Sequence, residues 1–116
     1  MVVFAGSRNK DGGTTVYWWN TDAGRGTAHL LPMYLDEKNS SPTGLEWGYN
    51  GSGPAQLAYA LLRFYLGKFM GSRVAGKWAQ DYHQKFKDEV IAGLPREGWQ
   101  MVETRIFDWL LHREDE

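Results

Sequence analysis

The chain has 116 residues, of which 42% are hydrophobic and 15% aromatic, and its formal net charge is −1. This length is typical of one domain with one core, and the apolar content argues against a disordered chain. The sequence contains no cysteine, which excludes disulfides, zinc ribbons and thiol catalysis. We predict a single domain over residues 1–116.

The sequence predicts neither export nor insertion into a membrane. Residues 1–6 lack the basic start of a signal peptide. The longest apolar stretch, 55–66, is interrupted by Gln56 and Arg63 and is shorter than the ~20 apolar residues of a membrane helix. We expect a cytoplasmic location.

The first twenty residues predict a β-hairpin. Residues 2–7 and 14–20 are rich in β-branched and aromatic side chains. Between them, Asp11-Gly12-Gly13 supplies the backbone freedom that a tight turn requires. The second strand is the stronger of the two predictions.

The next forty residues predict loops and short extended segments. Residues 28–35 are apolar but contain Pro32, which allows an edge strand or an irregular segment. Residues 45–49 read as extended, with Trp47 and Tyr49 on one side of the segment.

A first helix is predicted over residues 54–69. Gly53 or Ser52 can cap it, and Pro54 suits its first turn. Apolar residues recur every four positions in two neighbouring rows, so this helix is expected to be central and mostly buried.

Two further helices are predicted, over residues 73–92 and 104–112, with a short extended piece at 99–102 between them. The fold class is therefore α+β, with a small antiparallel sheet packed against three helices. In the second helix, the residues that recur every four positions are expected to form the buried face: Val74, Trp78, Tyr82, Phe86 and Val90.

The opposite face of the second helix is basic, with Arg73, Lys77 and Lys87. Residues 63–87 carry six basic side chains and one acidic one, whereas residues 88–116 carry three and eight. The basic face is a candidate for binding an acidic protein or phosphates, although a solvated helix face is the favoured interpretation. We expect nucleic-acid binding to be weak at most.

The turn Asn50-Gly51-Ser52-Gly53 precedes the first helix and is a candidate anion site, because helix N-termini attract negative charge. The alternative, which we favour, is that its glycines only let the chain turn. Glu46 is a candidate general base, but a structural pairing with an arginine such as Arg63 is favoured. These residues form our candidate site for a small anionic ligand or nucleotide.

The sequence contains no recognisable catalytic or metal-binding set. His29, His83 and His112 lie far apart, and no carboxylates have the spacing of metal ligands. We therefore expect a protein that is not an enzyme and that needs no metal or cofactor.

Residues 41–58 read SPTGLEWGYNGSGPAQLA. They resemble the signature S-P-T-G-F-E-W-G-Y-G-G-S-G-P-A-Q-L-A of a small uncharacterised domain family of bacteria, archaea and their phages. Leu45 replaces the family's phenylalanine and Asn50 a glycine, and residues 94–99 resemble its L-P-R-x-G-W segment. The resemblance implies a domain of unknown function. Its occurrence in phages implies an accessory protein that inhibits a host defence complex, as anti-CRISPR proteins do.

The aromatic second strand is a candidate partner-binding surface. Side chains alternate along a strand, so Val16 and Trp18 face one way while Tyr17 and Trp19 face the other. We predict that Tyr17 and Trp19 remain accessible and bind a protein partner or a second copy. Alternatively, the loop 21–36 or the third helix covers them.

Overall fold

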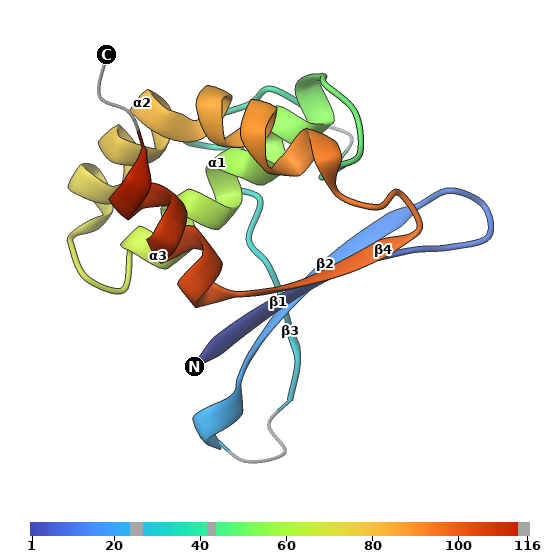
Figure 1. The fold of residues 1–116 in the computed structure, drawn as a ribbon, viewed down its shortest axis with the longest axis horizontal. Helices are drawn as coiled ribbons and strands as arrows, with labels where there is room; N and C mark the ends of the chain where they lie inside the picture. The colour runs from blue at the N-terminus through green and yellow to red at the C-terminus, as the bar shows by residue number, and fades with distance from the viewer. Residues whose placement is uncertain (24–26, 42–43, 114–116) are drawn as a thin grey trace.

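The computed structural model describes residues 1–23, 27–41 and 44–113. Within these residues, a four-stranded antiparallel sheet carries three α-helices on one face (Figure 1), which confirms the predicted α+β class. The strands are β1 (Val2–Arg8), β2 (Thr14–Asn20), β3 (His29–Leu30) and β4 (Gly98–Val102), and the helices are α1 (Ser52–Leu66), α2 (Ser72–Glu89) and α3 (Glu103–His112).

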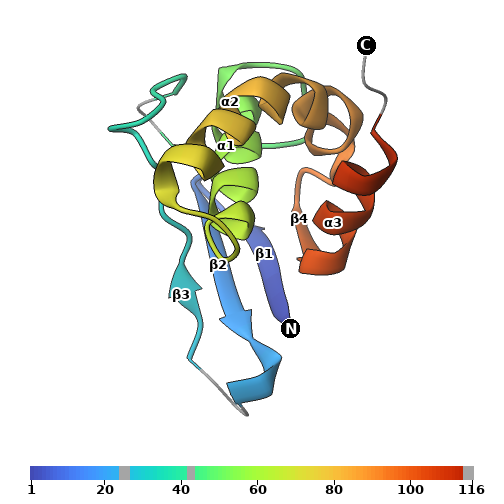
Figure 2. The ribbon, with the colours of Figure 1, turned by 90° about the vertical axis from the view of Figure 1, so that its left-hand side faces the viewer.

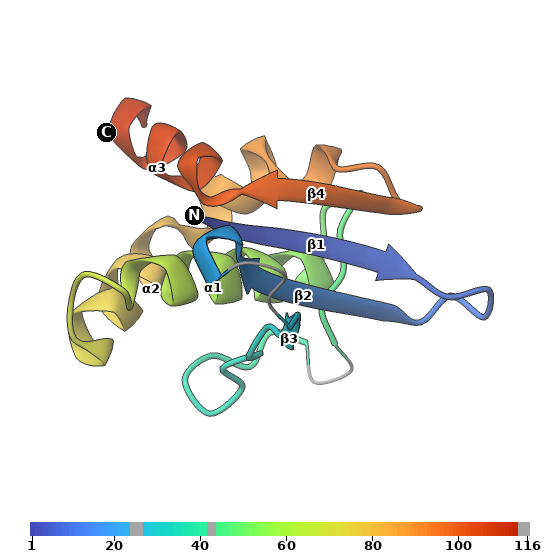
Figure 3. The same ribbon diagram turned by 90° about the horizontal axis from the view of Figure 1, so that it is seen from below.

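The order of the strands is β3-β2-β1-β4, so the predicted hairpin forms the centre of the sheet (Figure 3). In this register Phe4 of β1 lies opposite Trp18 of β2 and Met101 of β4. Phe4 and Met101 are buried beneath the helices, and Trp18 packs against the ring of Phe64 on α1. The two-residue strand β3 confirms the edge strand allowed by the proline-containing segment 28–35.

The central helix α1 is mostly buried, as predicted, and Leu57, Leu61 and Leu62 are fully inaccessible to solvent. It begins at Ser52, with Gly51 as its N-cap, two residues before the predicted start. It ends at Leu66, because the chain leaves the helix in a series of turns after Gly67. None of the helices in the described residues is both long and apolar enough to cross a membrane.

Helix α2 packs along α1 (Figure 2), and its buried face coincides only in part with the predicted one. Ala75 and Ala79 are fully buried, whereas Val74 is 47% exposed and Trp78 and Tyr82 are half-buried. Phe86 and Val90 are buried as predicted, and Trp78 and Tyr82 pack against the core at its edge. The prediction was wrong for Val74, because it took the large apolar side chains as the contact face. The small alanines allow the two helix backbones to approach closely, and the larger side chains then flank the contact.

The C-terminal end of α2 was also predicted too late. The helix ends at Glu89, and Ile91–Gly93 forms a separate 3₁₀ turn. Val90 connects the two with backbone angles outside the helical region (φ −123°, ψ −56°). Val90 and Ile91 are nevertheless buried, so the chain changes direction without leaving the core.

The segment 45–49 does not place Trp47 and Tyr49 in equivalent environments, contrary to the prediction. Trp47 is fully buried, but Tyr49 is 41% exposed. Gly48 between them has a φ of 84°, in the left-handed region, so the alternation of an extended segment is interrupted there. A side chain at position 48 would also collide with Arg96, since its Cβ would lie 2.5 Å from the Arg96 Cγ.

Candidate functional site

Glu46, the candidate general base, is held by an arginine other than the one suggested. The two terminal nitrogens of Arg8 donate to its two carboxylate oxygens at 2.8 and 2.7 Å. Arg63 pairs instead with Glu37, at 2.8 Å. The backbone N–H of Trp47 also donates to Glu46, at 3.2 Å. This bidentate contact with Arg8 fixes the carboxylate of Glu46 between β1 and the segment that leads to α1.

The same contacts decide what Glu46 can do chemically. The hydrogen bonds from Arg8 lower the pKa of Glu46, and those to Glu46 raise the pKa of Arg8. Both groups are therefore charged at neutral pH. A carboxylate whose pKa is lowered in this way is a weak proton acceptor, so the arrangement suits a structural pair better than a general base.

Trp47 connects this pair to the C-terminal half of the chain. Its indole N–H donates to the carbonyl oxygen of Arg96 at 3.0 Å. The guanidinium of Arg8 lies over its ring, 5.1 Å from the centroid, and the ring of Trp99 meets it edge-on at 5.6 Å. Trp47 thus joins β1, the segment before α1 and β4 in one buried cluster.

The glycine turn at 50–53 leads directly into α1. Gly51 is the N-cap and is extended (φ −170°), and no side chain caps the helix. Asn50 and Ser52 are exposed, whereas Gly53 is buried against the Glu46 side chain, where a Cβ would lie only 2.6 Å from the Glu46 Cβ. The candidate ligand residues are therefore together in space, with a carboxylate beside them.

A polar cluster that the sequence analysis missed lies on the other side of α1. Glu37 accepts hydrogen bonds from the Tyr59 hydroxyl at 2.9 Å and from Arg63 at 2.8 and 3.1 Å. Burial, together with the hydrogen bond to Glu37, raises the pKa of Tyr59 to about 12. The Tyr59 hydroxyl therefore keeps its proton at neutral pH and serves as a hydrogen-bond donor.

Gln56, one turn before Tyr59 in α1, also holds the segment that precedes the helix by hydrogen bonds, and it is fully buried. Its amide nitrogen donates to the carbonyl oxygens of Met33 and Lys38 at 2.7 and 2.8 Å, and its oxygen accepts from the N–H of Ser40 at 2.8 Å. Buried polar groups need such partners. The sequence feature that could have indicated these polar contacts is the presence of Gln56 and Arg63 in an otherwise apolar helix.

His83 is buried on the face of α2 that meets α1. Its Nδ1 lies 3.1 and 3.0 Å from the carbonyl oxygens of Ala79 and Gln80, which can only accept, so Nδ1 carries the proton. Its Nε2 has no hydrogen-bond partner among the described residues. Burial lowers the pKa of His83, so the neutral imidazole is favoured in the folded protein.

This burial predicts a loss of stability in mild acid. As the pH falls below 6.5, the ordinary pKa of histidine, the unfolded chain takes up a proton that buried His83 resists. We expect the melting temperature of the wild type to fall between about pH 7.5 and about pH 5.5, and to fall less for His83→Leu. Differential scanning fluorimetry at both pH values measures this. Equal falls in the two proteins would show that His83 is not responsible.

Within the part of the chain that the structure describes, no group of three or more histidine, aspartate or glutamate side chains is placed to hold a metal ion. His29 stacks on Trp18 at 4.6 Å, and the Nδ1 of His112 contacts the backbone of its own helix at 2.9 Å. The three histidines therefore lie in separate surroundings.

The basic residues of α2 do not share one surface. Arg73 and Lys77 are exposed in its first half, and Lys77 pairs with Asp81 at 3.1 Å. Lys87 lies in its last turn, where its side chain is only 14% exposed and contacts Asp88 at 3.4 Å. Only the first two of the three candidate cations are thus available to a partner.

The outer face of the sheet carries the exposed aromatic residues of β2. The register places Leu30, Tyr17 and Ala5 in one row across the strands, and Trp19, Val3 and Val102 in the next. Leu30 is 67% exposed, Val102 42% and Tyr17 36%, and Trp19 is half-buried. We call these six residues the open sheet face.

On this face Leu30, Tyr17 and Val102 are accessible to solvent, whereas Val3 between them is only 5% exposed and Ala5 is half-buried. All three helices lie on the opposite side of the sheet (Figures 1 and 3). The loop 21–36 was the alternative cover for this face. Part of it forms β3, which extends the sheet at its edge, and residues 24–26 lie outside the described residues. Exposed apolar side chains that lie together on a surface make that surface a candidate for contact with a partner.

In a comparison with protein families, residues 4–112 match the model of a family of unknown function, DUF6166. The chain therefore belongs to this family. No curated protein and no solved structure matches the chain.

Proposed function

We propose that this member of the DUF6166 family is a non-enzymatic protein-binding module that docks its partner, another protein or a second copy, on the open sheet face. The observation that carries the proposal is the exposure of Tyr17, Leu30 and Val102 around a half-buried Trp19. Aromatic residues in such a setting supply much of the binding energy of protein interfaces.

The other candidate function, binding of a small anion at the turn before α1, has less support. The turn offers the positive end of the α1 dipole. However, the carboxylate of Glu46 packs beside Gly53, and it is ionised because Arg8 lowers its pKa. Arg8 is itself engaged by Glu46, so it is not available to hold an anion there.

Replacing Trp19 with serine tests the role of the open sheet face. We expect the melting temperature to fall by only a few degrees, since the indole is half-buried on a face without covering elements. Self-association, measured by sedimentation velocity over a range of protein concentrations, is expected to weaken if the partner is a second copy. A loss of several kcal/mol in unfolding free energy, which is about the cost of deleting a fully buried tryptophan, would instead place Trp19 in the core.

We further propose that the partner belongs to a host defence complex, whose activity binding inhibits. The small size of the chain, the apolar binding surface and the resemblance to a family found in phages support this. We expect expression of the protein to restore phage plating on a host with active CRISPR interference, and Trp19→Ser to abolish the effect. Lys10→Ala, in the exposed turn between β1 and β2, is the matched control. Unchanged plating with the wild type would contradict the proposal.

A further inference from the structure

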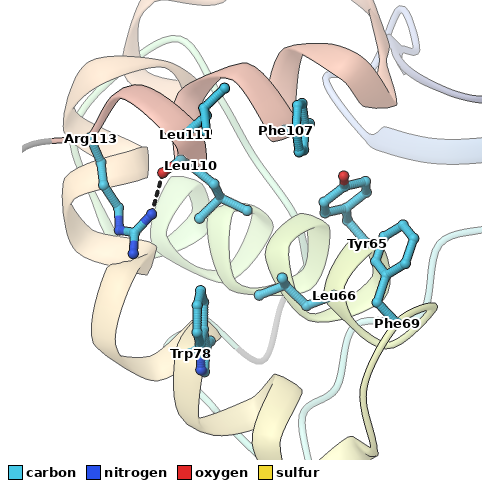
Figure 4. A pocket seen from close by; sticks show the side chains of 8 residues that line it. All are labelled: Tyr65, Leu66, Phe69, Trp78, Phe107, Leu110, Leu111 and Arg113. Carbon is cyan, nitrogen blue, oxygen red and sulfur yellow. Dashed lines mark hydrogen bonds between the residues drawn. The ribbon is translucent and has the colours of Figure 1, made fainter.

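A second apolar surface lies in the helical layer, where α3 stands over the end of α1 (Figure 4). It is a hollow of about 310 Å³ that we call the helix groove. Phe69 is 65% exposed, Leu111 62% and Phe107 49%. The walls include Tyr65, Leu66, Phe69, Trp78, Phe107 and Leu111.

A second hollow shares Trp78 with the groove but is otherwise lined by different residues. That hollow, of about 320 Å³, is lined by Arg73, Val74, Lys77 and Trp78. Trp78 is thus a shared wall, with apolar side chains on one side and the exposed cations of α2 on the other. Arg73 and Lys77 are two of the three cations predicted to bind a partner, and the third, Lys87, lines neither hollow.

The charged residues among those that line the two hollows are Arg73, Lys77 and Arg113. Arg113 lies at the end of the groove, over the rings of Trp78 and Tyr82, and none of the residues lining either hollow is a carboxylate. Asp81 contacts Lys77 at 3.1 Å, so part of the positive charge of the second hollow is already balanced, and Arg73 supplies the rest. A binding partner is therefore favoured if it is apolar on one side and acidic on the other.

We propose that the helix groove binds an acidic amphipathic α-helix of a protein partner. Bulky apolar side chains of that helix enter the groove, and carboxylates on its flank face Arg73 and Lys77. Tyr65, Leu66 and Leu110 are buried, whereas Phe69, Phe107 and Leu111 are exposed, so the groove is open on one side. An open groove suits a row of side chains from a helix better than an acyl chain that has to be surrounded. Apolar residues three or four positions apart in such a helix lie on one face.

This surface is separate from the open sheet face, because it lies in the helical layer and the open face is on the other side of the sheet (Figure 1). The inference does not rest on the proposed function. If both surfaces are used, the protein links two partners.

The test uses the full chain and a displayed library of helical peptides of about 16 residues, roughly four turns. We expect selection to enrich sequences with bulky apolar residues at i, i+3 or i+4 and with a net negative charge. Binding of the enriched peptides, measured by fluorescence anisotropy, is expected to weaken at least about tenfold in the double variant Phe107→Ser, Leu111→Ser. It is also expected to weaken in Arg73→Glu, Lys77→Glu and with added salt.

One control variant and one replacement variant complete the test. Trp19→Ser, on the open sheet face, is expected to leave peptide binding unchanged. Should the serine double variant fail to fold, Phe69→Ser in the exposed turn after α1 replaces it, because its ring is mostly in solvent.

Several outcomes would overturn the proposal. They are the absence of enriched peptides, enrichment without acidic residues, and binding that is insensitive to the groove variants. A further one is displacement of the peptides by laurate below its micellar concentration, which would identify a site for small amphiphiles instead.

Discussion

Replacing Trp47 with alanine is expected to lower the free energy of unfolding by about 3–5 kcal/mol, which is the range for deleting a large aromatic side chain from a core. Trp47 is fully buried, its ring contacts Trp99, and its N–H donates to Arg96. The substitution leaves a cavity and removes the buried hydrogen bond at once. Urea denaturation followed by circular dichroism measures the change.

Trp19→Ala is the matched control for this experiment, because it deletes the same side chain at a half-buried position of the sheet. We expect it to cost much less. Equal losses in the two variants would contradict the assignment of Trp47 to the core and of Trp19 to a surface. A Trp47→Ala variant that kept wild-type stability but lost binding would assign a functional role to the 41–58 motif.

Replacing Gly53 with valine is the second substitution with a large expected effect, about 2–3 kcal/mol of lost stability. The new Cβ would lie 2.6 Å from the Glu46 Cβ and 3.3 Å from the Tyr49 hydroxyl. Glu46 cannot move aside without breaking its two hydrogen bonds with Arg8. Thermal unfolding monitored by circular dichroism checks this expectation.

Gly93→Val serves as its control, since a Cβ at Gly93 meets no atom within 4 Å. We expect it to be far better tolerated than Gly53→Val. If both valine substitutions were equally mild, the close packing of the turn against Glu46 would not limit stability.

The strand pattern of the sequence predicted the central hairpin and the two faces of β2, but not the order of the four strands. Alternation along β2 placed Val16 and Trp18 beneath the helices and Tyr17 outside, and the structure confirms this arrangement. Alternation is reliable here because β1 and β2 pair without a bulge over seven residues each. The same reasoning was wrong for Trp47 and Tyr49, because the positive φ of Gly48 rotates the chain between them.

Side-chain size misled the prediction of the buried face of α2. A helix buries the face that allows closest packing, and Ala75 and Ala79 provide it against α1. As a result, Val74 and Trp78 are left to form the walls of the two hollows beside the helix. The groove could not be predicted from the sequence for the same reason, since it depends on which face of α2 turns inward.

The sequence pattern also did not predict which oppositely charged residues pair in the folded protein. The contacts of Arg8 with Glu46 and of Arg63 with Glu37 join residues 38 and 26 positions apart. Spacing along the chain contains no information on such pairs. The sequence did show that polar side chains interrupt an apolar helix. When such side chains are buried, they need hydrogen-bond partners.

Photo-crosslinking tests the central claim, that the open sheet face is the docking surface, most directly. The photoreactive residue p-benzoylphenylalanine replaces Tyr17 in one variant and the exposed Lys10 in another, and both are irradiated in the native host. The account predicts an adduct with one protein, or with a second copy, from position 17, none from position 10, and its loss when Trp19→Ser is added. Absence of an adduct at position 17, or equal adducts at both positions, would contradict it.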